Sequence, residues 1–420
     1  MNSVSERATR HQLPIVILTL ILDYIGFAIL IPIGPLLFTE PSSPHYLLSN
    51  YSSDSGYILF GLLVASYPLA QFLAAPVLGQ LSDRYGRKPV LSIALVGTMF
   101  SYILFALGIF TANIPLLFFS RILDGITGAN VTVAQASLAD ITEPQHRSKV
   151  FGYMGASIGV GITLGPLVGG KLSDPSVVNW FNSATPFWFA AILSFLNVLS
   201  VQAFFVETLK TKNNQATLKI NKSFANIVRA FSLPNLRTLF TTSFLFGAGF
   251  AFYTAFASVF LVHRFGFDQS KLGNFFFYTG MMVVLTQAFV PRLMATRFSE
   301  RQLLRVSLIA ASVFPLLYVL THVWWCLLLI FPFYSAFVSL SMANITSLVS
   351  KSAKAENQGE VLGINTSVQG LAQSIPPILG GIVAAQWVYF APLVVSAGTL
   401  FLAGVVFLLG YKSEGKPNES

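Results

Sequence analysis

Three ionisable residues stand inside long apolar stretches of this 420-residue chain, where a charge is costly. Asp23 is the one ionisable residue between Pro14 and Phe38, and Arg121 and Asp124 lie together in another apolar stretch. An arginine within a membrane helix costs at least about 2.5–3.5 kcal/mol on insertion scales, and it persists where it faces water or a partner. Such groups indicate chemistry in which a proton or a charged ligand is bound and released.

Each of these residues has two interpretations. Asp124 follows Arg121 by three residues, which allows a local ion pair on one helix face; the alternative is a protonation or substrate switch. Asp23 can load and release a proton as its surroundings alternate, or it is a static partner of Arg121 or of the backbone. Polar span residues such as Gln135 line a cavity or bond a neighbouring helix. We expect these four residues to couple protons to a substrate.

The elements that would position these residues are twelve apolar spans, each with roughly the 20 residues that a helix needs to cross a bilayer. Backbone groups in lipid must be bonded within the segment, and the runs lack period-two alternation, so the spans are helices and not barrel strands. The predicted fold class is therefore all-α, a polytopic membrane protein. The spans are 14–38, 56–78, 90–111, 114–139, 149–172, 184–206, 238–262, 272–295, 302–321, 323–350, 359–384 and 388–411.

Composition and charge agree with this interpretation. With 54% hydrophobic and 10% charged residues, the chain cannot place most of its apolar surface inside one soluble core. The net charge of +9 would suit a nucleic-acid partner, but the basic residues gather in alternate loops. With the N-terminus inside, 21 of the 25 Lys and Arg lie in inside segments, and only Lys171, Arg264 and Lys271 lie outside. We therefore expect both termini in the cytoplasm and no nucleic-acid partner.

A polar, Lys-rich interruption at 207–237 divides the chain into an N-terminal six-helix half (1–206) and a C-terminal six-helix half (238–420), and it is predicted to be a cytoplasmic linker. Spans five and eleven are copies of one element, and both run from inside to outside, so the repeat is parallel. Six residues of span five are identical to the residues 211 positions later, in span eleven. They are Val150, Gly152, Gly159, Pro166, Gly169 and Gly170.

The loop predicted after span two reads Gly79-Gln-Leu-Ser-Asp83-Arg-Tyr-Gly86-Arg87-Lys88-Pro89. Gly79 is expected to permit a tight exit from the helix, and Asp83 and Arg87 can pair with each other or with helix ends. The alternative is an ordinary cytoplasmic loop whose basic residues follow the positive-inside rule. The segment resembles the signature loop between helices two and three of the major facilitator superfamily. The resemblance implies two six-helix halves with a substrate site between them, and a cytoplasmic gate at which Asp83 meets span eleven.

Span four contains Arg121-Ile-Leu-Asp124-Gly-Ile-Thr-Gly-Ala129 and ends Ala139-Asp140-Ile-Thr, a run that resembles the tetracycline-exporter branch of the drug:proton antiporters in that superfamily. In the branch, the arginine that matches Arg121 is implicated in proton transfer, whereas an acid at the position of Asp124 is not part of the general motif. Span five resembles the glycine-proline motif of antiporters, with small residues that let another helix approach and a proline that bends the span. The motif implies efflux and comprises Gly155, Gly159, Gly165, Pro166, Gly169 and Gly170.

The predicted function is secondary active transport: proton-coupled efflux of a small organic molecule such as a drug, siderophore or metabolite. The alternatives are a proton-coupled uptake symporter of the same fold and a non-transporting receptor or assembly protein. The sequence has no Walker loop, nucleotide fingerprint, nucleophile elbow or His-Glu cluster, so we expect neither an enzyme nor a cofactor nor a metal site. Tetracycline exporters are expected to carry an acid in helix nine, whereas 302–321 has none, which disfavours transport of a tetracycline-metal complex.

The remaining expectations concern single residues and the setting of the protein. Cys326 lies beside Trp324 and Trp325, which favours a structural role at an interfacial aromatic belt. His263 at an outside helix end is expected to be exposed. The first span is interpreted as a retained signal anchor. We expect a monomeric, multi-pass protein of the inner (plasma) membrane, whose partners are a small-molecule substrate, protons and lipids.

Overall fold

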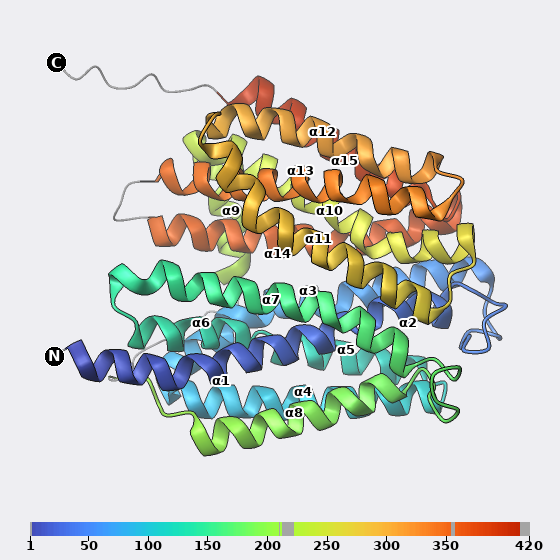
Figure 1. The fold of residues 1–420 in the computed structure, drawn as a ribbon, viewed down its shortest axis with the longest axis horizontal. Coiled ribbons are helices and arrows are strands. Elements are labelled where there is room, and N and C mark those ends of the chain that lie inside the picture. Colours follow the sequence, from blue (N-terminus) through green and yellow to red (C-terminus); the bar gives the residue numbers. More distant parts are fainter. Residues whose placement is uncertain (1, 210, 212–221, 354–357, 412–420) are drawn as a thin grey trace.

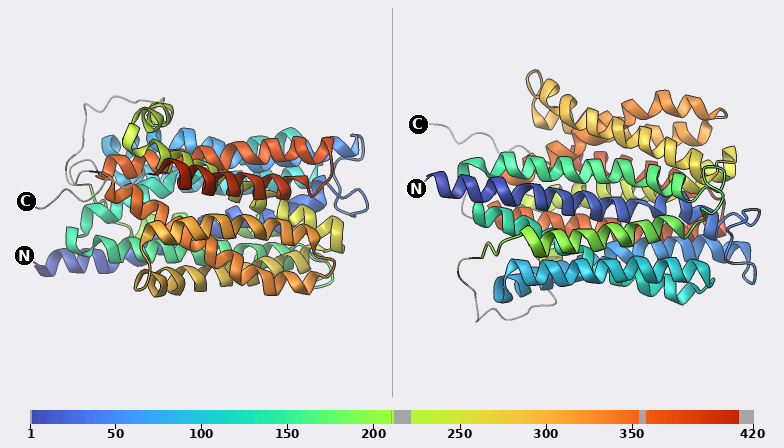
Figure 2. Two further views of the ribbon diagram at one scale, coloured as in Figure 1. Left: turned by 90° about the horizontal axis from the view of Figure 1, so that it is seen from above. Right: turned by 60° about the horizontal axis from the view of Figure 1, so that its bottom comes forward.

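The structure, a computed structural model, describes residues 2–209, 211, 222–353 and 358–411. In these residues twelve helical spans are long and apolar enough to cross a membrane, which confirms the predicted number and the all-α fold class. The spans run roughly parallel (Figures 1 and 2). The helices are α1 (Asn2–Ala28), α2 (Leu30–Phe38), α3 (Ser53–Tyr85), α4 (Arg87–Phe110), α5 (Ile114–Gly128), α6 (Asn130–Ile141), α7 (Arg147–Leu172), α8 (Thr185–Phe204), α9 (Lys222–Ser232), α10 (Pro234–Phe265), α11 (Gln269–Ala295), α12 (Glu300–Leu320), α13 (Trp324–Lys351), α14 (Gln358–Gln386) and α15 (Ala391–Gly410).

Helices α1–α8 and helices α10–α15 form two groups, the first in the lower and the second in the upper part of Figure 1. The groups meet chiefly along two helix pairs, α3 with α14 and α7 with α11. We call the end of the bundle at which α1 begins and α15 ends the terminal end, and the opposite end the loop end. These two helix pairs are therefore where any movement of one group against the other must be accommodated.

Two of the twelve spans are interrupted helices. The first span consists of α1 and α2, separated at Ile29, where Pro32 has no N–H to donate to the carbonyl of Ala28. The fourth span consists of α5 and α6, separated at Ala129. Asn130 is thus the first residue of α6, close to a break in regular backbone.

One predicted helix boundary is wrong. Helix α3 continues to Tyr85, beyond the predicted end at residue 78, so Gly79 lies inside the helix and does not form its exit. The predicted linker, 207–237, contains α9 and the start of α10 at Pro234. The prediction ended α3 too early because hydropathy marks the part of a helix that lies in hydrocarbon, and polar turns that project beyond it carry no such signal.

Candidate functional site

Asp23 on α1 is buried, with 8% of the residue exposed, and its carboxylate is bonded to a residue far along the chain. The side-chain amide of Asn130 donates to Asp23 Oδ2 at 2.8 Å. Asn130 is the first residue of α6, directly after the break between α5 and α6, and it is fully buried. The sequence analysis does not single out Asn130, because nothing in the sequence pairs it with α1.

Arg121 and Asp124 form a buried ion pair on α5, as their spacing predicted. Arg121 Nη1 lies 2.8 Å from Asp124 Oδ2, and each side chain is only 3% exposed. The Arg121 guanidinium also lies over the ring of Tyr67 on α3, 5.0 Å from its centroid. A cation over an aromatic face in a dry site is stabilised by the ring quadrupole. Arg121 is therefore held by α5 and by α3 together.

This cluster contains one cation and two carboxylates. Arg121 is paired with Asp124, whereas Asp23 is bonded to a neutral amide, so the carboxylate without a cationic partner here is Asp23. Two buried polar atoms of the cluster, Arg121 Nε and Asn130 Oδ1, have no hydrogen-bond partner. Because an unpaired buried donor and acceptor are costly, these atoms are suited to bind a water molecule or a polar group of a ligand.

The glycines of α7 bring this helix against the part of α1 that carries Asp23. A Cβ atom on Gly161 would lie 2.6 Å from Tyr24 Cβ, and one on Gly165 would lie 2.6 Å from Ala28 Cβ. Gly169 is equally close to the backbone of Ile29. Of the small residues predicted for close helix packing, Gly165 and Gly169 therefore pack on α1.

A second charged cluster lies at the terminal end, where Gly86 alone separates α3 from α4. Gly86 has φ +115°, a conformation that L side chains rarely adopt. Arg87, which follows it, is 6% exposed and pairs with Asp83 at 2.6 Å and with Asp140 of α6 at 2.9 Å. The predicted contact between Asp83 and span eleven is not among the contacts of the described residues, and the Asp83 side chain is 48% exposed.

Glu207, three residues after the end of α8, caps the start of α4, a contact that the sequence analysis missed. The backbone N–H groups of Arg87 and Lys88 donate to its carboxylate at 2.9 and 3.1 Å. Partial burial alone would raise the pKa of Glu207, but hydrogen bonds from Leu209, Arg87 and Lys88 outweigh it and hold the pKa below its ordinary 4.5. A Cβ on Gly86 would collide with this carboxylate. The glycine is thus required both by φ and by the cap.

At the loop end the two groups are joined by polar contacts. Lys171 Nζ of α7 donates to Ser270 Oγ of α11 at 2.9 Å. On the other side of the bundle, His263 Nε2 lies 3.2 Å from the Tyr57 hydroxyl and His263 Nδ1 lies 3.5 Å from Glu40 Oε2. The prediction that His263 is exposed is wrong, since its side chain is only 17% exposed. Residues of the first group cover it.

The surroundings of the glycines differ between the loop end and the terminal end of the two helix pairs. Near the loop end, Cβ atoms on Gly170 and Gly381 would collide with the backbone of the opposite group. Towards the terminal end, Cβ positions on Gly79, Gly155 and Gly363 have no other atom within 4 Å. The groups are therefore tightly packed at the loop end and have open space beside the same helices at the terminal end.

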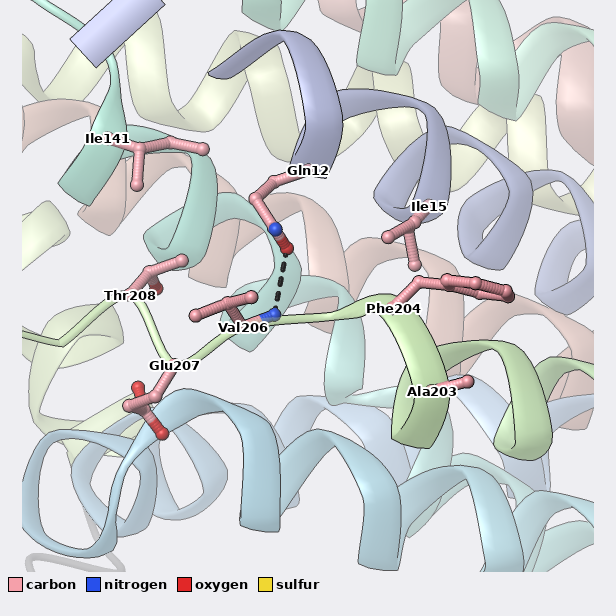
Figure 3. Close-up of a pocket in the computed structure, with 8 residues that line it drawn as sticks. All are labelled: Gln12, Ile15, Ile141, Ala203, Phe204, Val206, Glu207 and Thr208. Atoms are coloured by element: carbon pink, nitrogen blue, oxygen red, sulfur yellow. Dashed lines mark hydrogen bonds between the residues drawn. The ribbon is translucent and has the colours of Figure 1, made fainter. Parts of the chain in front are cut away.

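A pocket of about 650 Å³ lies at the terminal end of the first group (Figure 3). The side-chain oxygen of Gln12 accepts a hydrogen bond from the N–H of Val206 across it. Gln12 precedes Asp23 by 11 residues, roughly 16 Å along a helix at 1.5 Å per residue. This pocket is therefore distinct from the Asp23 cluster. Its lining residues are Gln12, Ile15, Ile141, Ala203, Phe204, Val206, Glu207 and Thr208.

The other predicted site residues lie outside the Asp23 cluster. Gln135 is exposed on α6, one and a half turns beyond Asn130. A Cβ on Gly159 would contact Val284 of α11 at 3.1 Å, so this motif glycine faces the second group. Pro166 lies inside α7. Among the described residues no cluster of three His, Cys, Asp or Glu could hold a metal ion.

Comparison with known proteins identifies related sequences over nearly the whole chain. The family model "Major Facilitator Superfamily" matches residues 16–376 and 294–420. The class B tetracycline resistance protein of Escherichia coli is 28% identical over 95% of this chain and 96% of its own. The class H protein of Pasteurella multocida is 30% identical, over 93% and 92%. Multidrug resistance protein 2 of Bacillus subtilis (strain 168) is 24% identical, over 98% of both chains.

Solved structures share the fold. The human organic anion transporter MFSD10 (TETRAN) superposes with a TM-score of 0.68 at 25% identity, over 95% of this chain and 99% of that one. A bacterial homologue of the human lysosomal transporter Spinster, inward-facing and occupied, gives a TM-score of 0.79 at 14% identity, over 95% and 96%. At such low identity the second likeness concerns the fold alone.

Proposed function

This chain belongs to the drug:proton antiporter branch of the major facilitator superfamily, and from that membership we propose that it exports a small organic molecule in exchange for protons. The observation that carries the proposal is the buried carboxylate Asp23, bonded to Asn130 and without a cationic partner in this cluster. Such a group changes charge when it takes up a proton, so it links proton binding to the electrostatics of the bundle.

The proposed orientation places the terminal end in the cytoplasm, because 21 of the 25 basic residues lie in segments at that side. In this orientation the tightly packed loop end faces the outside, and the end with open space beside α3, α7 and α14 faces the inside. The halves 1–206 and 238–420 would rock about α3, α7, α11 and α14 to reverse this arrangement.

In the proposed cycle, Asp23 is loaded with a proton from the outside and releases it to the cytoplasm, while the cargo moves the other way. Arg121 and Asp124, held against Tyr67, keep the charge beside Asp23 in place. When the outside opens, the terminal end closes and Asp83, now paired with Arg87, would meet the start of α14. The carboxylate would then lie at a helix N-terminus, which favours it by roughly 0.3–2 kcal/mol.

The proposed cargo is a small organic molecule that is not a tetracycline-metal complex. Two of the relatives are named for resistance to tetracycline and one for multidrug resistance. The one carboxylate of α12 is Glu300, at the first residue of the helix, where it pairs with Lys351 at 2.8 Å. A carboxylate engaged at the end of the helix is not available for a cation in the middle of the bundle.

The test is proton movement in everted membrane vesicles, reported by a pH-sensitive dye while drugs and metallophores are added. We expect at least one compound to release protons through the wild type and not through Asp23→Asn. The matched control is Asp54→Asn, which removes an exposed carboxylate at the loop end and should behave as wild type. An equal response of Asp23→Asn would refute the role of Asp23. Inward accumulation of the compound in intact cells would instead show uptake.

A further inference from the structure

Helix α9, which is not one of the twelve spans, lies across the bundle at the terminal end (Figures 1 and 2). It contacts both groups at once. Ser223 Oγ donates to the carbonyl of Phe72 on α3 at 2.7 Å. Asn226 Nδ2 donates to Ser367 Oγ on α14 at 3.1 Å, and Arg229 pairs with Glu360 of the same helix. The side of α9 that carries Ser223 and Asn226 is thus packed over the line at which α3 and α14 meet.

The helical repeat divides the rest of α9 into two further sides. Phe224, Val228 and Phe231 follow one another by four and three residues, so they share a face. They are 52%, 71% and 39% exposed. Ala225 and Arg229 are also exposed, and their spacing places them together on a different side. Helix α9 therefore has a packed side, an apolar open side and a polar open side.

The two spans on which α9 packs also carry exposed apolar residues. Leu69, one turn before Phe72 on α3, is 37% exposed, and Leu379 on α14 is 46% exposed. Both helices are membrane spans, so the bilayer covers such residues. A helix that lies across these spans with three large apolar residues outward meets the same bilayer.

The charge around α9 also suits a membrane surface. Arg229 is half exposed on the polar side, and the sequence that leads into the helix carries Lys210, Lys212, Lys219 and Lys222. Basic residues beside an amphipathic helix are attracted to anionic phospholipid headgroups. Apolar and basic features therefore indicate the same kind of partner.

We infer that α9 is an interfacial membrane helix, which inserts Phe224, Val228 and Phe231 into the lipid leaflet at the terminal end and turns Ala225 and Arg229 towards water. Helix α9 is also hydrogen-bonded to α3 and to α14, so the element that binds the lipid leaflet contacts both groups. The inference requires only that the twelve helices span a bilayer. It does not depend on the direction of transport or on the cargo.

The test is spin labelling of the full-length protein in vesicles of phosphatidylethanolamine and phosphatidylglycerol. The chain has one cysteine, Cys326, so a Cys326→Ser background gives single labelling sites. Val228→Cys and Ala225→Cys form a matched pair on two sides of one helix, and Phe224→Cys repeats the apolar site. Collision with dissolved oxygen, which partitions into lipid, is compared with collision with a water-soluble nickel chelate.

We expect the ratio of oxygen to nickel-chelate collisions to be at least about threefold higher at Val228 and Phe224 than at Ala225, as interfacial insertion requires. Equal ratios at the three sites would place the apolar side in water and overturn the inference. Protection of Val228 and Phe224 from both reagents would also overturn it, because another part of the protein would then cover that side.

Discussion

At the scale of single residues, the buried charges differ in how they are compensated. Arg121 and Asp124 balance each other within one helix, whereas Asp23 depends on a hydrogen bond from a residue 107 positions away. Removing one partner of a buried ion pair lowers stability strongly, whereas replacing both partners with neutral residues changes stability little. The two alternatives for Arg121 and Asp124, a static pair and a switch, can therefore be separated by comparing single and double substitutions.

We predict that Asp124→Asn or Arg121→Gln alone destabilises the protein by about 3–5 kcal/mol, because each leaves one buried charge unpaired. The double variant should be clearly more stable than either single variant. Thermal unfolding in detergent measures these differences, and vesicle assays measure transport. A stable double variant that transports cargo would identify a static pair, whereas a stable but inactive one would identify a switch. Single variants as stable as wild type would contradict the prediction.

The Glu207 cap gives a prediction with a defined pH dependence. Glu207→Gln should lower stability by about 1 kcal/mol, the usual contribution of a helix cap. Because folding lowers the pKa of Glu207, the carboxylate stabilises the protein above its ordinary value of 4.5, and this contribution is lost as the pH falls through the lower folded value. The melting temperatures of variant and wild type should thus differ at pH 7 and converge in acid. A difference that persists unchanged at low pH would show that the charge is not responsible.

At the scale of elements, α7 links the Asp23 cluster to the interface between the groups. Its glycines at 161, 165 and 169 pack on α1 beside Asp23, and Gly170 meets α11. A change in the tilt of α7 would therefore alter both its packing on α1 and its contact with α11. The sequence predicted that this helix packs closely, but one helical pattern does not specify which neighbour each glycine faces.

We predict that Gly170→Ala disfavours closure of the loop end. The added Cβ would lie 2.4 Å from the carbonyl oxygen of Gln269, and such overpacking costs about 1–3 kcal/mol. Gly152→Ala is the matched control on the same helix, because its Cβ position has no other atom within 4 Å. Spin-label distances across the loop end should lengthen in Gly170→Ala and stay as in wild type in the control. Unchanged distances in both variants would contradict the packing argument.

At the scale of the whole molecule, the proposed rocking of the two halves requires that the joined loop end separates. The contacts there are of several kinds, since the Lys171 bond to Ser270 lies between α7 and α11 and the His263 contacts lie between α3 and α10. Polar contacts at a surface contribute little each, so closure can be reversed.

We predict that linking Lys171→Cys to Ser270→Cys with a short, reducible thiol reagent, in the Cys326→Ser background, stops transport. The wild-type side chains touch at 2.9 Å, so the link should form readily and hold the loop end closed. Cargo-driven proton movement in vesicles should fall to background and return when the link is reduced. Lys171→Cys alone, treated in the same way, is the control. Continued transport by the linked protein would show that the loop end does not need to open.

The sequence by itself determined the twelve spans, the repeat between spans five and eleven and the spacing of Arg121 and Asp124. These features depend on local hydropathy and helical periodicity, which a chain carries regardless of its neighbours. Only the tertiary structure decided that Asn130 bonds Asp23 and that Glu207, 120 residues from Arg87, caps α4. It also decided that the loop end is the closed end. Such contacts depend on how each helix is rotated and packed, which no single segment specifies.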